Sequence, residues 1–90
     1  MATANEDIGL EWEKIADPTE DFLITVRGAA IELAVSNTET APTIDFGHHV
    51  SQYKGNAGMR SILGPGYVYA RVFPGSRGAT AKAAISRWAL

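Results

Sequence analysis

The sequence predicts an all-β fold, a small antiparallel β-sandwich or barrel of about six to seven strands with a flexible N-terminal arm. Two observations predict it. Short runs rich in β-branched and aromatic residues alternate between apolar and polar positions, as strands with one buried face do. Turn-forming residues interrupt these runs every 8–12 residues or so, which is typical of sandwiches and barrels.

The N-terminal segment divides into an arm and a first strand. Residues 1–10 are expected to form a flexible acidic arm, since they are small, polar and without a period. Residues 11–90 form a single β domain. The run LEWEKIA at 10–16 alternates and is the first candidate strand. The run DPTED at 17–21 is a turn, because an Asp-Pro step favours turn initiation.

The next two runs, FLITVRG at 22–28 and AAIELAVS at 29–36, are predicted strands. Only Gly28 and small neighbours separate them, so a tight hairpin is expected. Glu32 should face outward. The inward-facing residues should be Phe22, Ile24 and Val26 in the first run and Ile31, Leu33 and Val35 in the second.

The middle of the chain carries weaker patterns. The run SNTETAPT at 36–43 is a loop of turn formers, and IDFGHHV at 44–50 is a weak strand or irregular segment. Residues 51–60 are polar and contain glycines, which favours a loop. A short strand, RSIL at 60–63, ends at the turn GPG.

The C-terminal quarter predicts a last hairpin. YVYARVF at 67–73 is the strongest strand, with its tyrosines, Arg71 and Phe73 on one face. PGSRG at 74–78 is a turn. ATAKAAISRW at 79–88 also suits a helix of two turns by its alanines, but turn spacing and its threonine, isoleucine and tryptophan favour a strand.

Length and composition limit what holds the domain together. Ninety residues form at most one domain, and one of this size is marginally stable alone. The chain has no cysteine, which excludes disulfides and thiolate metal sites. Self-association or docking onto a larger assembly is therefore expected. No apolar run approaches the roughly 20 residues of a membrane span, and the acidic start is unlike a signal peptide.

Charge is distributed unevenly along the chain. Residues 1–21 hold seven acids and one base, a net of −6, whereas residues 46–90 hold six bases and no acid, a net of +6. This asymmetry favours a basic face for a polyanion or head-to-tail pairing of protomers. The alternative is that the acidic segment folds back over the basic half of its own chain.

Enzymatic and metal chemistry find little support, and no catalytic, metal-binding or cofactor-binding residue is predicted. His48 and His49 are adjacent, so on a strand they point to opposite faces and share no metal easily. Asp45 is close enough in sequence for a contact with His48 that depends on pH. No nucleophile elbow or phosphate-binding loop is present.

Two binding functions remain as alternatives. A single-stranded nucleic-acid-binding β-barrel would stack bases on a strand face where Tyr67, Tyr69 and Phe73 are interleaved with Arg71. The phosphates would be contacted by Arg27, Arg60 and Lys82. The sequence pI of about 5.5 disfavours it, since such domains are usually basic. A small glycan-binding module would instead use exposed tryptophans, which requires the two near the chain ends to meet at a sheet edge.

Four stretches carry a resemblance to small β-sandwich virion structural proteins of tailed bacteriophages. They are WEKIADPTEDFLITVRG, IELAVSNTETAPT, SILGPGYVYARVF and ATAKAAISRW. The resemblance implies a non-enzymatic protein of the capsid-decoration, neck or fibre-base type, located in the virion and assembled in the host cytoplasm. It implies no cofactor and no membrane partner.

The expected partners are further copies of the chain, as a trimer or higher homo-oligomer, and capsid or tail subunits. The N-terminal arm and the sheet edges would make the subunit contacts. Arg71 discriminates between the alternatives: paired with a carboxylate it is structural, and open to solvent beside Tyr69 it favours nucleic acid. The candidate interface residues are Trp12, Arg60, Tyr67, Tyr69, Arg71, Phe73, Arg77 and Trp88.

Overall fold

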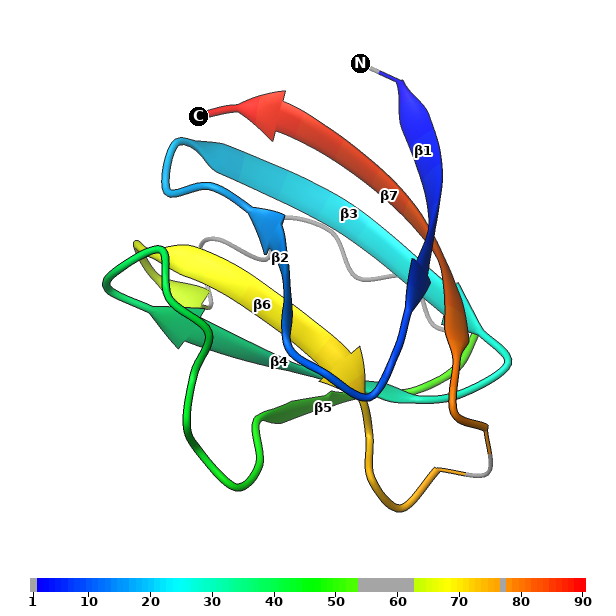
Figure 1. Cartoon of the computed structure of the whole chain (residues 1–90). Coiled ribbons are helices and arrows are strands. Elements are labelled where there is room, and N and C mark those ends of the chain that lie inside the picture. The colour runs from blue at the N-terminus through cyan, green and yellow to red at the C-terminus, as the bar shows by residue number, and fades with distance from the viewer. Residues whose placement is uncertain (1, 54–62, 77) are drawn as a thin grey trace.

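The computed structural model describes residues 2–53, 63–76 and 78–90 and is all-β (Figure 1). The described residues form seven strands. These are β1 (Thr3–Ile8), β2 (Glu13–Ala16), β3 (Glu20–Arg27), β4 (Ile31–Ser36), β5 (His48–Val50), β6 (Tyr67–Val72) and β7 (Ala81–Ala89). The strand predicted at 60–63 falls largely outside the described residues. In the described part of the chain, no helix has the length and apolar character needed to cross a membrane.

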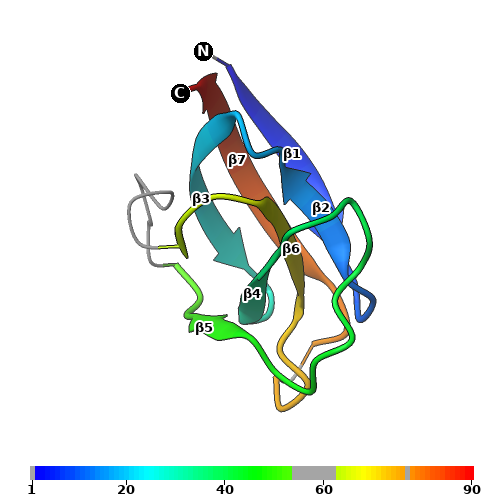
Figure 2. The same cartoon turned by 90° about the vertical axis from the view of Figure 1, so that its left-hand side faces the viewer.

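The strands form two antiparallel sheets that pack face to face, which confirms the predicted β-sandwich. One sheet has the order β1-β7-β3 and the other the order β2-β6-β4-β5. Figure 2 shows the two layers from the side, with the N- and C-terminal ends at the same end of the sandwich.

The core lies between the sheets and follows the period-two pattern. The predicted inward residues of β3, Phe22, Ile24 and Val26, are all fully buried. Alternate residues of β6 and β7 are buried against the same core. Only part of the second predicted set is fully buried, since Val35 packs at the margin of the core. The fully buried large apolar side chains are Ile8, Ile15, Phe22, Ile24, Val26, Ile31, Leu33, Val68, Val72 and Ile85.

The two predicted hairpins are wrong. β3 pairs with β7 and β4 pairs with β6, so each short connection carries the chain from one sheet to the other. Gly28 makes the first crossing with a φ of +87°, a conformation that glycine adopts without steric cost. The two strands on either side of each connection lie in opposite sheets, and each has one apolar face. Both apolar faces therefore pack into the core between the sheets.

The predicted flexible arm is also a strand. β1 pairs with β7 along its whole length, from Thr3 opposite Ser86 to Ile8 opposite Ala81. Ile8 is fully buried, so its apolar side chain anchors the strand to the core. The β domain therefore begins within residues 1–10, not after them.

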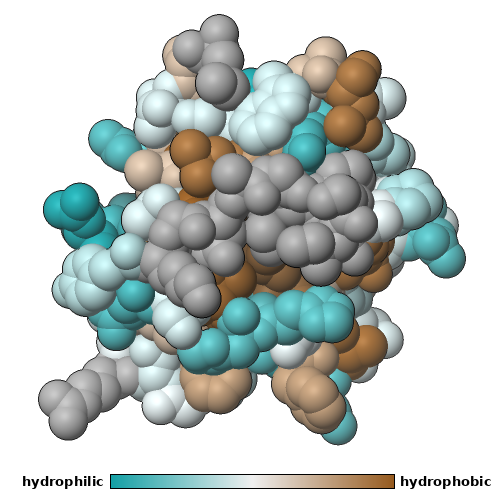
Figure 3. Space-filling model, turned by 180° about the vertical axis from the view of Figure 1, so that it is seen from behind, coloured by the Kyte–Doolittle hydropathy of each residue, from teal (hydrophilic) through white to brown (hydrophobic). Residues whose placement is uncertain are grey.

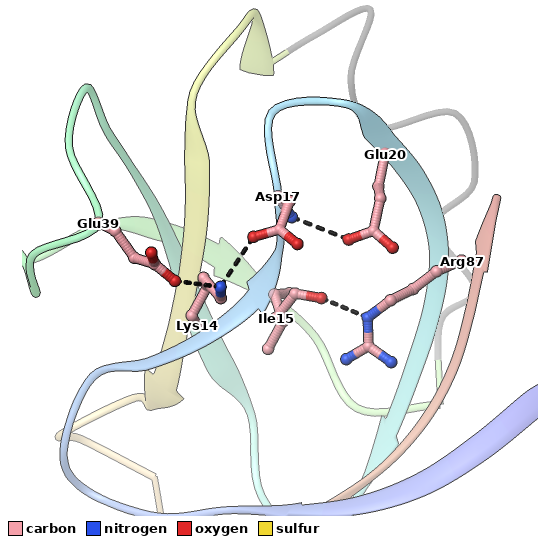
Figure 4. A network of polar contacts seen from close by, with 6 residues as sticks. All are labelled: Lys14, Ile15, Asp17, Glu20, Glu39 and Arg87. Carbon is pink, nitrogen blue, oxygen red and sulfur yellow. Dashed lines mark hydrogen bonds and ion pairs between the residues drawn. The ribbon is translucent and has the colours of Figure 1, made fainter. Parts of the chain in front are cut away.

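Lys14 of β2 connects this strand to the loop between β4 and β5 through ion pairs (Figure 4). Its ammonium donates to Asp17 Oδ1 at 2.8 Å and also to Glu39 Oε2 in that loop. These hydrogen bonds, Asp17's first, raise the pKa of Lys14 above its ordinary value of 10.5. The protonated form is thus favoured by folding.

This contact should give the stability a dependence on alkaline pH. A raised folded-state pKa adds stability that is fully present below 10.5 and is lost as the pH rises through the folded value. We expect Lys14→Met to lower the urea midpoint at pH 7, and the difference from wild type to shrink by about pH 11.5. Urea unfolding at both pH values measures this. A difference that stays constant would contradict the role of Lys14.

Candidate functional site

A row of polar side chains crosses the outer face of the four-stranded sheet. The strand register places Arg71 of β6 opposite Glu32 of β4, and Glu32 opposite His49 of β5. Trp12, immediately before β2, lies over Arg71 on the far side. We call Trp12, Arg71, Glu32 and His49 the Arg71 row. Strands β4, β5 and β6 each contribute one residue to this row, and Trp12 comes from the position just before β2.

Arg71 is engaged on three sides within its own chain. Its Nε donates to Glu32 Oε1 at 2.6 Å, and an Nη donates to the carbonyl of Asp45 at 2.7 Å. Its guanidinium carbon lies 4.3 Å from the centre of the Trp12 ring, within the range of a cation–π contact. The Glu32 side chain is fully buried. Arg71 is therefore a structural residue, and its carboxylate partner belongs to the same chain.

Glu32 points outward as predicted, but its side chain is covered and fully buried. Arg71 lies beside it and the segment that contains Asp45 lies close by. Glu32 Oε2 and Trp12 Nε1 are buried without a hydrogen-bond partner among the described residues. Burying an unsatisfied polar atom costs about 1–3 kcal/mol. The single hydrogen bond from Arg71 reaches Oε1 of Glu32 and leaves Oε2 without a donor among the described residues.

The predicted aromatic face is only partly exposed. Tyr69 is buried, and Tyr67 is half-buried with the Lys14 ammonium 5.8 Å from its ring centre. Phe73 meets the His49 ring edge-on, with 4.9 Å between centroids and 82° between planes. These contacts leave little of the strand face for stacking against nucleobases.

Trp88, another of the predicted interface residues, does not join the Arg71 row. Trp88 lies on β7 opposite Asp21, in the three-stranded sheet, whereas Trp12 adjoins the four-stranded sheet. The two tryptophans therefore belong to different layers. Arg60 and Arg77 lie outside the described residues.

The acidic and basic ends of the chain pair with each other, as the folding-back alternative expected. Arg87 Nη2 lies 2.8 Å from Glu6 Oε2, and Lys82 Nζ lies 3.6 Å from Asp7 Oδ1. Arg87 Nε also donates to the carbonyl of Ile15 at 2.5 Å, which links β7 to β2 in the opposite sheet (Figure 4). Part of the charge asymmetry is thus neutralised within one molecule.

An apolar pocket beside β4 and β5 was not predicted. It has a volume of about 310 Å³, and we call it the Phe46 pocket. Phe46 is 76% exposed and Ile44 is 49% exposed at its mouth. Its lining residues are Leu33, Ala34, Val35, Ile44, Phe46, Gly47, His48 and Leu63.

Gly47 allows the loop to approach β4 closely at this pocket. A Cβ at this position would lie 2.4 Å from the carbonyl oxygen of Leu33 and 3.1 Å from the Trp12 ring. No larger residue fits there without a shift of the backbone. The run IDFG at 44–47 is the part of the sequence that indicates this pocket, because two apolar residues in a loop are followed by a glycine.

The outer face of the three-stranded sheet carries a second hollow, of about 480 Å³. Its lining mixes both signs of charge with small residues: Asn5, Glu6, Asp7, Thr25, Arg27, Lys82, Ala83 and Ala84. This mixture favours neither an anion nor an apolar group. On the back of the molecule, a row of hydrophilic side chains lies directly below an area of hydrophobic surface (Figure 3).

The two histidines lie on alternate faces of β5, as predicted. His48 is opposite Leu33 and lines the Phe46 pocket, whereas His49 is opposite Glu32 in the Arg71 row. Within the described residues, no three His, Asp or Glu side chains are grouped so that they could hold a metal ion.

Comparison with known proteins found no match among protein-family models, curated proteins or solved structures.

Proposed function

We propose that the protein is a non-enzymatic structural subunit of a tailed-phage virion, which self-associates and docks on a capsid or tail. The observation that carries the proposal is the Phe46 pocket. Its two exposed apolar side chains, Phe46 and Ile44, line a hollow whose residues are mainly apolar, next to the edge strand β5. Apolar surface grouped in this way marks interaction sites on soluble proteins.

The pocket suits an apolar side chain presented by another virion protein. Covering Phe46 and Ile44 removes apolar area from water, which stabilises a complex by about 25 cal/mol for each Å² buried. Contact through aromatic anchors in pockets is the usual source of strong local binding energy at interfaces. In this proposal, copies of the chain meet through sheet edges, and the assembly docks through the Phe46 pocket.

The alternative, single-stranded nucleic-acid binding, has less support. It requires Arg71 and Tyr69 to be accessible to a nucleic-acid strand, but Arg71 forms an ion pair with Glu32 and Tyr69 is buried. Retention on single-stranded DNA that weakens with rising salt would favour this alternative. We expect no retention at low salt.

The docking proposal is tested by removing the exposed aromatic ring. We expect Phe46→Ser to weaken co-sedimentation with purified capsids or tails at least tenfold, that is by about 1.4 kcal/mol or more. Its free energy of unfolding should stay within about 0.5 kcal/mol of wild type, since the side chain is mostly exposed.

Tyr53→Ser is the matched control, because Tyr53 is 75% exposed and does not line the pocket. It should co-sediment like wild type. A wild-type protein that stays free of the particles, or equal losses in both variants, would contradict the proposal.

A further inference from the structure

We propose that β1 is the contact for a second copy of the chain, which adds its own β1 antiparallel to extend the sheet. The inference deepens the proposed function, since it rests on the proposed self-association and names the surface involved. β1 lies at the edge of its sheet, and among the described residues no strand pairs with its outer side. Exposed edges of this kind are templates for pairing with another chain.

β1 is the more open of the two edges of this sheet. It is six residues long and contains neither proline nor lysine, two residues that commonly protect an edge. Thr3, Ala4 and Asn5 are exposed. The opposite edge, β3, is partly occupied, because the Tyr53 amide donates to the carbonyl of Val26 at 2.8 Å.

The charges on β1 do not protect its edge as isolated charges would. Glu6 pairs with Arg87 and Asp7 pairs with Lys82, both on the neighbouring strand of the same molecule. A second strand would therefore meet a segment whose charges are balanced by its own chain. The acidic N-terminal segment and the basic C-terminal segment thus neutralise each other at this edge, which is how we explain the charge asymmetry of the sequence.

Antiparallel pairing of β1 with its own copy fixes the register. A two-fold axis through the sheet requires one residue to lie opposite itself. With Asn5 on the axis, Ala4 lies opposite the partner's Glu6 and Thr3 lies opposite the partner's Asp7. No acid then faces an acid. An axis at Glu6 or Asp7 places like charges opposite each other, which is destabilising, and an axis at Ala4 pairs less of the strand.

The Asn5 register is also chemically self-complementary. An asparagine amide carries both a donor and an acceptor, so two copies of Asn5 can satisfy each other. The Thr3 hydroxyl shares a hydrogen bond with the Ser86 hydroxyl at 2.7 Å, in which either can donate. Thr3 can accept from Ser86 and donate to the partner's Asp7. The contact makes a six-stranded sheet from two molecules.

A two-fold contact has a consequence for the size of the assembly. It closes on itself, so an assembly of three or more copies needs a second interface and contains an even number of copies. The proposed trimer or higher oligomer is thereby narrowed to tetramers, hexamers and larger even assemblies.

Cross-linking tests the contact directly, because the chain has no cysteine. Under mild oxidation, Asn5→Cys should form a disulfide-linked dimer at the two-fold axis. Thr25→Cys is the matched control, since Thr25, Ala84 and Asn5 lie in one row across the sheet and Thr25 is on its other edge strand. Covalent dimer from the first variant and little from the second would support the contact. Equal yields would overturn it.

A positive charge introduced at the edge separates this inference from the proposed function. Asn5→Lys places two like charges opposite each other and should raise the dissociation constant at the β1 contact at least tenfold, or about 1.4 kcal/mol. Thr25→Lys should change it less than about twofold. Sedimentation of both variants measures this. An oligomer with an odd number of copies, or one that Asn5→Lys leaves intact, would overturn the β1 contact and leave the proposed self-association standing. A monomer at every concentration would contradict both.

Discussion

Arg71→Ala should lower the free energy of unfolding by about 3–5 kcal/mol, because removing one partner of a buried ion pair leaves the other charge uncompensated. The Glu32 carboxylate is fully buried, and Arg71 supplies the hydrogen bond that its Oε1 receives. The same substitution removes the cation–π contact with Trp12 and the hydrogen bond to the carbonyl of Asp45. Denaturant unfolding followed by far-UV circular dichroism measures the loss.

The matched control removes both charges together. The double variant Glu32→Leu with Arg71→Met replaces the pair by apolar side chains of similar size, which is often neutral or stabilising by about 1–4 kcal/mol. It should therefore be clearly more stable than Arg71→Ala. If Arg71→Ala lowers the free energy of unfolding by less than about 1 kcal/mol, the Arg71–Glu32 pair does not stabilise the fold as a buried ion pair.

Phe22→Ala should lower the free energy of unfolding by about 3–5 kcal/mol, the usual cost of deleting a buried aromatic ring. Phe22 is fully buried on β3, in the layer between the sheets. Its sequence neighbour Leu23 points to the other side and is 37% exposed, so Leu23→Ala serves as the control. Most of the apolar area of Leu23 is not in the core, and its truncation should cost no more than about 1 kcal/mol.

Guanidinium chloride unfolding of both variants tests the assigned strand faces. A similar loss for Phe22→Ala and Leu23→Ala would contradict them, because the sandwich buries only one face of β3 completely. A one-residue shift in register would exchange the two faces.

The faces of the strands could be predicted from the sequence, whereas their partners could not. Alternation in FLITVRG and YVYARVF fixes which residues point inward, since that depends only on the pleat of one strand. The layer that each strand occupies depends on contacts between residues far apart in the sequence. Gly28 marks a tight connection equally well in a hairpin and in a crossing between sheets.

The N-terminal strand was missed for a related reason. Thr3 to Asp7 are small or polar, so local propensity gives no strand signal there. The strand forms because β7 offers an unpaired edge, the Ile8 side chain is buried, and Arg87 pairs with Glu6. All of these are long-range effects.

Three of the candidate interface residues chosen from the sequence lie close together in the fold. Trp12 and Arg71 belong to the Arg71 row, and Phe73 contacts His49 of that row. The role of Glu32 was missed, because the period-two pattern cannot distinguish a solvent-facing residue from one covered by a distant segment. Phe46 was missed because it lies in a loop, where no periodic pattern reports exposure.

Sedimentation velocity of the wild-type protein in 0.15 M salt, over a wide range of concentrations, tests the central claim most directly. We expect a defined oligomer with an even number of copies, because a self-associating subunit with a two-fold β1 contact assembles in pairs. A species that remains monomeric at the highest concentration would contradict the account of this protein as a subunit of a larger assembly.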